Sequence, residues 1–309
     1  MNTPLVTIGL PAVKAIFLEK SIKSCLSQSY SNIEIIIQNN AIDQTKKKQI
    51  KEIVEKFSDN RIRYHETKNQ IPMVQNWNSI LQKAKGEFFS ILCDDDLWEP
   101  RFIEEIILLS NKYQNTNIFH SRVVIINDQG EIVRLTENYP EYEDCIDFIY
   151  YRLTGHRSTY LSDFVVKTKS LRDINGYVDL PDGWGSDTIT WFKLSLIGGI
   201  GYTREKLCNY RVSNINVSNS KSNRNKHRAI DEQYEILEDI FNLIRITDRY
   251  TAIQKQKLLE ELGKFRGKNK AFLIKQTLIN RYHIPKDISL FLSITYKVLY
   301  NKIRGPKII

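Results

Sequence analysis

Short apolar runs and amphipathic stretches alternate over the first part of this chain. Runs rich in β-branched and aromatic residues are separated by segments in which apolar residues recur every three or four positions. We expect the runs to form buried strands over 5–11, 33–38, 61–65, 87–92 and 118–127. Because strands and helices alternate in this rhythm, they predict right-handed crossovers and an α/β fold with a mostly parallel central sheet.

The segments between these runs carry the signals of helix ends. Pro72 and Pro100 suit the first turn of a helix, and Gly86 suits the position after the end of one. The run at 33–38 is too continuously apolar for a half-exposed strand, so we expect both of its faces to be covered. The predicted helices cover about 18–28, 45–57, 72–84 and 99–110.

The rhythm changes after residue 127. Asp128, Gln129 and Gly130 predict a hairpin turn. Asp187 stands where a later helix should begin, so capping is its default role. In chain order we expect a helix over 144–153, a strand over 163–166, an ordered loop over 174–187, a helix over 188–199, two brief strands and a mobile polar segment over 212–225.

The C-terminal part of the chain has a different character. Apolar residues recur at helical spacing over 230–244, 258–265 and 288–303. The net charge of +9 is also concentrated there, because residues 221–309 hold 19 Lys+Arg against 9 Asp+Glu, whereas residues 1–220 hold 26 against 27. We therefore expect a first domain over 1–220 and a basic helical region over 221–309.

The composition bounds the class of protein. With 309 residues, 41% of them hydrophobic, the chain is long enough for a large core. The cysteines, Cys25, Cys93, Cys145 and Cys208, form no CxxC pair, and the 5 histidines are scattered, which fits reducing cytosol and no zinc site. Neither a signal peptide nor a run of about 18 apolar residues is present, so we expect a cytoplasmic protein, peripheral to a membrane at most.

Three adjacent carboxylates follow the fourth apolar run, at Asp94, Asp95 and Asp96. Neighbouring carboxylates repel one another unless a positive charge lies among them, and a hard divalent cation such as Mg²⁺ or Mn²⁺ prefers carboxylate oxygens. The alternative is that these acids only cap and charge the N-terminus of the next helix. Ligands of parallel sheets bind beyond the carboxyl ends of the strands, where Asn39 and Asn40 also fall, and this convergence favours a binding site.

Taken in order, four segments resemble the inverting GT-A-fold glycosyltransferases of family 2, which transfer a sugar from a nucleotide donor to an acceptor. The resemblance covers about residues 4–220. Its segments are the opening strand and the following LSQSYSNIEIIIQN (26–39), AKGEFFSILCDDDLWEP (84–100), INGYVDLP…GWGSD (174–187) and LCNYRVSNINVS (207–218).

The resemblance implies roles for individual residues on the donor side. In the DxD-type segment, Asp95 and Asp96 would bind the metal, Mn²⁺ or Mg²⁺, while Asp94 and Asp96 would also hold the ribose and diphosphate. Further donor contacts would come from Pro11, Asn39 and Arg211. On the acceptor side, Asp187 would be the general base and Trp184 an aromatic platform for a sugar, although Trp184 is equally suited to packing.

The chain departs from this family pattern at three places. The family usually has Thr-Tyr-Asn after the proline of the first strand, but this chain has Ala-Val-Lys, with the lysine at position 14. Lys14 could reach a phosphate or stay solvated. Asn39 replaces the aspartate that reads the base, which leaves nucleotide binding intact and the base preference open. Ser213 replaces a histidine that many relatives supply to the metal, while Arg211 could offset phosphate charge or only tie the loop down.

The basic region over 221–309 has two interpretations. Most of its apolar residues should pack on the catalytic domain as a helical bundle. Its lysines and arginines, together with the stretch 288–303, also suit an anionic membrane surface, which fits a lipid-linked acceptor. Nucleic acid is a weaker explanation, because aromatic residues do not interleave with the basic ones.

The resemblance, together with the basic region, implies a metal-dependent inverting transferase with a nucleotide-sugar donor, UDP-sugar first, and a glycan or lipid-linked acceptor in surface polysaccharide or lipooligosaccharide synthesis. A nucleotidyltransferase is the second enzyme class, but GLPAVKAIF is a poor phosphate loop. A catalytically degenerate GT-A module is the non-enzymatic alternative, prompted by the three departures. The intact aspartates argue against it.

Overall fold

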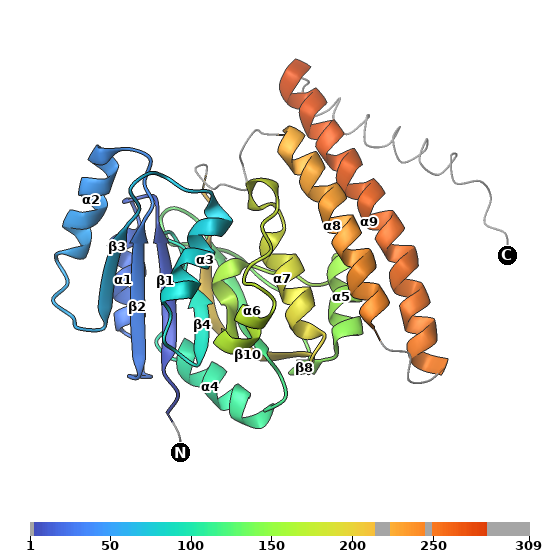
Figure 1. The fold of residues 1–309 in the computed structure, drawn as a ribbon, viewed down its shortest axis with the longest axis horizontal. Helices are drawn as coiled ribbons and strands as arrows, with labels where there is room; N and C mark the ends of the chain where they lie inside the picture. The colour runs from blue at the N-terminus through green and yellow to red at the C-terminus, as the bar shows by residue number, and fades with distance from the viewer. Residues whose placement is uncertain (1–2, 214–222, 245–248, 283–309) are drawn as a thin grey trace.

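The computed structural model describes residues 3–213, 223–244 and 249–282 (Figure 1). Its central sheet has the strand order β3-β2-β1-β4-β9-β6-β10-β5. One half of the sheet is parallel throughout, because each crossover passes through a helix. This half consists of β1 (Val6–Ala12), β2 (Ile33–Asn39), β3 (Ile62–Glu66) and β4 (Phe88–Ile91).

The other half of the sheet is mixed. Strands β6 (Ile118–Ile126) and β10 (Ile200–Arg211) are parallel to each other, whereas β9 (Phe164–Lys167) runs antiparallel to both of its neighbours, β4 and β6. The three remaining strands are short: β5 (Leu97–Trp98) and β8 (Tyr142–Glu143) pair with β10, and β7 (Ile132–Leu135) pairs with β6.

Helices cover both faces of this sheet, and each face has its own core. Successive strand residues point to opposite faces, so Ile36 packs in one cluster with Trp77, while Ile35 and Ile37 pack in the other with Ile22. This explains why the whole of β2 is buried. The helices of the first 213 residues are α1 (Leu18–Leu26), α2 (Gln44–Val54), α3 (Met73–Lys83), α4 (Phe102–Lys112), α5 (Cys145–Leu153), α6 (Thr168–Asp173) and α7 (Ser186–Ser195), with one-turn helices η1 (Leu161–Asp163) and η2 (Pro181–Gly183).

Two long helices follow, α8 (Asn223–Leu243) and α9 (Arg249–Tyr282), and they lie side by side (Figure 1). Leu237 and Phe241 of α8 and Leu258 and Leu262 of α9 belong to the same buried cluster as α5 and α7. The predicted boundary at residue 220 and the stretch 288–303 lie outside the described residues. Within the described part, no helix has the length and apolar character that crossing a membrane requires.

The predicted α/β fold with a mostly parallel central sheet is confirmed, and the local differences have local causes. The two brief strands expected after residue 199 form one strand, β10, with register shifts between Thr203 and Cys208. The helix expected from Glu99 begins at Phe102, because Leu97 and Trp98 first pair with β10. A two-residue strand of this kind depends on its partner and has no periodic signal of its own.

Candidate active site

The three aspartates lie where the carboxyl ends of β1 and β4 meet. These strands are parallel neighbours, with Gly9 opposite Ile91, so the loops that follow them are adjacent. Oδ2 of Asp94 accepts hydrogen bonds from the backbone amides of Val13 and Lys14, at 2.7 Å each. Asp94 therefore holds the loop after β1 against the loop after β4.

Asp96 is fixed by two segments that are distant in the sequence. Its Oδ2 accepts a hydrogen bond from Ser162 Oγ at 2.6 Å, and its Oδ1 accepts one from the backbone amide of Arg211 at 2.8 Å. The buried guanidinium of Arg211 donates from Nε to the carbonyl oxygen of Asp95 at 2.9 Å. Arg211 thus ties the acidic loop to the end of β10, and its predicted contact with phosphate stays a prediction.

Asp95 has a different kind of partner. Its Oδ2 lies 2.9 Å from the ammonium nitrogen of Lys14, in an ion pair across the two loops. Ligand atoms of Cys93, Asp95 and Asp96 all lie within 4.8 Å of one another, close enough to share one metal ion. Two carboxylates suit the hard cations Mg²⁺ and Mn²⁺, and the thiol of Cys93 suits softer ions. The donor set therefore fits the predicted metal through Asp95 and Asp96.

The electrostatics of the acidic loop also favour a bound cation. Burial, and next the charge of Asp95, raise the pKa of Asp94 to about 6 and the pKa of Asp96 to about 8. Backbone amides and Ser162 oppose these shifts by donating hydrogen bonds to the ionised forms. Because crowded, buried carboxylates are costly to ionise, a divalent cation among them would relieve the repulsion.

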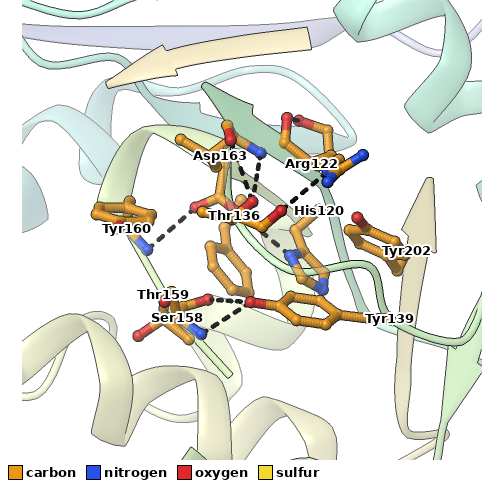
Figure 2. A network of polar contacts seen from close by, with 12 residues as sticks. His120, Arg122, Thr136, Tyr139, Ser158, Thr159, Tyr160, Asp163 and Tyr202 are labelled. Atoms are coloured by element: carbon orange, nitrogen blue, oxygen red, sulfur yellow. Dashed lines mark hydrogen bonds and ion pairs between the residues drawn. The ribbon is translucent and has the colours of Figure 1, made fainter. Parts of the chain in front are cut away.

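A buried polar network surrounds Asp163, the residue that follows Ser162 in the chain (Figure 2). Oδ1 of Asp163 accepts a hydrogen bond from the amide of Tyr160 at 3.1 Å, and its Oδ2 lies 3.2 Å from Nδ1 of His120. The His120 ring stacks on Phe164, with 4.7 Å between ring centroids. Burial lowers the pKa of His120 to about 3, so the imidazole is neutral at physiological pH. Sequence reasoning missed Ser162 and Asp163, since no spacing motif marks them.

Asp187 lies in the first turn of α7. We expected it to cap this helix, but the capping position is taken by Gly185, whose φ of 81° suits glycine. Oδ1 of Asp187 instead accepts a hydrogen bond from the amide of Thr188 at 2.7 Å. Burial raises the pKa of Asp187, although the Thr188 amide and the charge of Arg152 oppose the shift.

Asp187 and the acidic loop both affect the pKa of one buried carboxyl group, that of Asp163. The pKa of Asp163 is raised well above its ordinary value, first by burial and then by the charges of Asp187 and Asp96. Arg152 accompanies Asp187 on this side and donates from Nε to Thr159 Oγ1 at 3.0 Å. Arg152 was not predicted, because it lies in the last turn of α5 and nothing in the sequence relates it to α7.

Trp184 lies in the loop before α7, and helix α8 packs against it. The ammonium of Lys226 is 4.3 Å from the centroid of the Trp184 ring, and Nε2 of Gln233 donates to the Trp184 carbonyl oxygen at 2.8 Å. The Trp184 side chain is only partly buried. Its predicted role as an acceptor platform stays a prediction, and Lys226 of the C-terminal region is its neighbour.

The remaining predicted donor residues lie around the ends of the first strands. Pro11 is opposite Gln38 within the sheet. Asn39 is completely buried, and its amide donates to the carbonyl oxygen of Lys47 at 2.9 Å and to the hydroxyl of Tyr64 at 2.8 Å. These contacts join Asn39 to α2 and β3 rather than to the acidic loop. Ser213 is buried after the end of β10.

Comparison with known proteins decides the family. The family model described as Glycosyl transferase family 2 matches residues 14–172, slightly more than half of the 309 residues. The chain belongs to glycosyl transferase family 2. The match includes the acidic loop together with Ser162 and Asp163, but it ends before Asp187.

Relatives of this family 2 chain are named as glycosyltransferases. An uncharacterized glycosyltransferase of Rickettsia typhi is 25% identical over 76% of this chain and 70% of its own length. Another, of Rickettsia felis, is 32% identical over 42% of this chain, and the match spans only 21% of that relative. A putative colanic acid biosynthesis glycosyl transferase of Escherichia coli is 30% identical over 46% of this chain and 50% of its own. These names confirm the predicted enzyme class.

Solved structures confirm the GT-A-like fold of this family 2 chain. TarS of S. aureus, in complex with UDP-GlcNAc, superposes with a TM-score of 0.62 and 16% identity, over 83% of this chain and 71% of that one. The mannosyltransferase PcManGT from Pyrobaculum calidifontis, in complex with GDP-Man and Mn²⁺, gives a TM-score of 0.60 and 14% identity, over 98% and 83%.

Proposed function

We propose that the protein is a metal-dependent inverting glycosyltransferase, which moves a sugar from a nucleotide-sugar donor to a glycan or lipid-linked acceptor. One observation carries this proposal: ligand atoms of Cys93, Asp95 and Asp96 lie within 4.8 Å of one another just after the end of β4, where a donor-bound cation could be held. An inverting transferase also needs a base near the anomeric carbon, and the shared influence of Asp187 and Asp96 on the pKa of Asp163 supports Asp187 for that role.

On the donor side, Asp95 and Asp96 would hold Mn²⁺ or Mg²⁺. When bound, the cation stabilises the negative charge that develops on the departing nucleoside diphosphate. Asp94 keeps the loop after β1, including Lys14, in contact with the acidic loop, and Arg211 keeps the acidic loop in place from β10. These contacts orient the donor diphosphate before the reaction begins.

On the acceptor side, Asp187 accepts the proton of the acceptor hydroxyl. The acceptor oxygen then bonds to the anomeric carbon while the bond from that carbon to the diphosphate breaks, and the configuration inverts. A raised pKa makes the carboxylate of Asp187 a stronger base than an exposed aspartate. Trp184 lies in the same loop as the exposed Asp182, and its aromatic ring would support the acceptor sugar.

A UDP-sugar is the first donor to test, because a fold neighbour binds UDP-GlcNAc, and GDP-Man is the second, because another neighbour binds it with Mn²⁺. The relative named for colanic acid biosynthesis supports a surface polysaccharide or lipooligosaccharide as the product. The excess of basic residues over 221–309 supports work at the cytoplasmic face of an anionic membrane, where a lipid-linked acceptor would be available.

The test is release of nucleoside diphosphate from UDP-, dTDP-, GDP- and CMP-sugars in Mn²⁺, Mg²⁺ or EDTA. We expect slow turnover of one donor that stops in EDTA and in the variant Asp95→Ala. If no donor is turned over and none raises the melting temperature, the degenerate binding module is the better description. Metal binding without binding of any nucleotide sugar would favour the nucleotidyltransferase alternative.

A further inference from the structure

Lys14 is attached to the acidic loop at two points. Its backbone amide donates to Asp94 Oδ2 at 2.7 Å, and its ammonium lies 2.9 Å from Asp95 Oδ2. The two side chains of the ion pair are largely shielded, with 21% of Lys14 and 11% of Asp95 exposed. The backbone hydrogen bond holds the main chain of Lys14 in place, and the ion pair holds its ammonium group against Asp95.

The three carboxylates differ in the kind of group that contacts them. Asp94 accepts from two backbone amides, and Asp96 accepts from a serine hydroxyl and a backbone amide. These neutral donors orient a carboxylate but do not cancel its charge. For Asp95, the ammonium of Lys14 supplies a full positive charge on one carboxylate oxygen.

The oxygen that Lys14 contacts belongs to a carboxylate that a metal would need. Asp95 is one of the residues whose ligand atoms lie together at the candidate metal position. A divalent cation and an ammonium cannot both sit against this oxygen without repelling each other. The free protein therefore carries its own competitor for the metal.

We propose that Lys14 is a resident counter-ion, which occupies Asp95 until the donor arrives and so makes metal binding depend on the donor. This inference rests on the proposed function, because it needs a donor diphosphate. The diphosphate supplies new anionic oxygens to which the flexible lysine side chain can turn, and Asp95 becomes available to the metal that accompanies the donor. The loop backbone stays in place throughout, because Asp94 and not Lys14's side chain holds it.

The experiment measures Mn²⁺ binding by the loss of the free-ion EPR signal, with no turnover required. Wild type, Lys14→Met, Lys14→Arg and the control Lys23→Met are titrated with Mn²⁺, first alone and then with saturating UDP. Lys23 is a suitable control because it also forms an ion pair, with Glu19 on α1. Circular dichroism and the melting temperature verify that each variant is folded.

We expect Lys14→Met to bind Mn²⁺ at least about tenfold more tightly than wild type without UDP, the equivalent of one competing ion pair. UDP should strengthen Mn²⁺ binding strongly in wild type, Lys14→Arg and Lys23→Met, but much less in Lys14→Met. Equal or weaker Mn²⁺ binding by Lys14→Met without UDP would overturn the proposed role of Lys14 but would leave the proposed metal-dependent function untouched. If wild type binds UDP but never Mn²⁺, the metal-dependent function itself fails.

Discussion

Gln233 on α8 donates a 2.8 Å hydrogen bond to the carbonyl oxygen of Trp184, just ahead of the predicted base Asp187. The C-terminal helices are therefore in direct contact with the loop that leads into α7. Gly185 permits this contact, because a Cβ there would lie 2.7 Å from the Gln233 side chain. The position of Asp187 thus depends on a helix far along the chain.

We predict that Gly185→Ala destabilises the protein more than Gly155→Ala. Both glycines have positive φ, 81° and 86°, so both substitutions carry about 1 kcal/mol of backbone strain. Only Gly185 also meets a neighbour, the amide end of the flexible Gln233 side chain, whereas nothing lies within 4 Å of a Cβ at Gly155. Urea unfolding should show an additional cost of about 0.5–1.5 kcal/mol at Gly185, because Gln233 must move and lose its hydrogen bond to Trp184. When Gly185→Ala is combined with Gln233→Ala, part of this additional cost should disappear. If the two losses in free energy of unfolding simply add, the contact between these residues is contradicted.

Asp187→Asn should bind the donor as wild type does and lose transfer by a factor of about 10² to 10⁴, because an amide cannot accept the acceptor proton. The matched control is Asp182→Asn, in the same loop but exposed. Donor affinity by calorimetry and transfer rates by product formation separate the two effects. Retention of transfer by Asp187→Asn would remove Asp187 from the mechanism.

The acid limb of the pH–rate profile should lie above pH 3.8. A general base works in its ionised form, so the rate falls as the pH drops through the pKa of Asp187, which burial raises from 3.8. The charge of Arg152 lowers that pKa, so Arg152→Gln should move the limb to higher pH. The test is the pH profile of kcat/KM for wild type, Arg152→Gln and the exposed control Arg134→Gln. If the acid limb of Arg152→Gln stays at the wild-type pH or moves to lower pH, the prediction is contradicted.

Ser162→Ala should cost about 1–3 kcal/mol of stability and weaken binding of Mn²⁺ with UDP. Ser162 Oγ donates to Asp96 at 2.6 Å and accepts from the Cys93 amide at 3.1 Å, so its removal leaves two buried groups without this partner. The control Ser158→Ala removes a more exposed hydroxyl. Unfolding curves and EPR titration provide the measurements. Metal binding that is unchanged in folded Ser162→Ala would show that Asp96 needs no such support.

The sequence predicted what depends on short-range patterns. The continuous apolar run of β2 correctly indicated a strand buried on both faces, and Asp94 to Asp96 do follow the end of β4 as expected. The helix start at Asp187 was misread as a cap, because a local pattern does not separate the capping position from the first turn two residues later. The φ of Gly185 settles that choice, and it is a property of the folded chain.

The supporting residues of the site could not be predicted in this way. Ser162 reaches Asp96 across 66 positions of sequence, and Arg211, which reaches the same residue across 115, was named only through the family resemblance. Arg152 approaches Asp187 from a different helix. Such partners are selected by tertiary packing, and neither hydrophobic periodicity nor spacing encodes them. The carboxylates proposed for the chemistry were thus named from the sequence, but most of the groups that hold them were not.

The antiparallel strand β9 between β4 and β6 has a consequence for how this chain is made. Both of its partners precede it in the sequence, so they have already left the ribosome when β9 emerges. Until then, β4 and β6 each expose an unpaired strand edge, which is a template for aggregation. Nascent chains that stop before residue 164 should therefore stay bound to chaperones or precipitate, and the central sheet should close late, through pairings of high contact order.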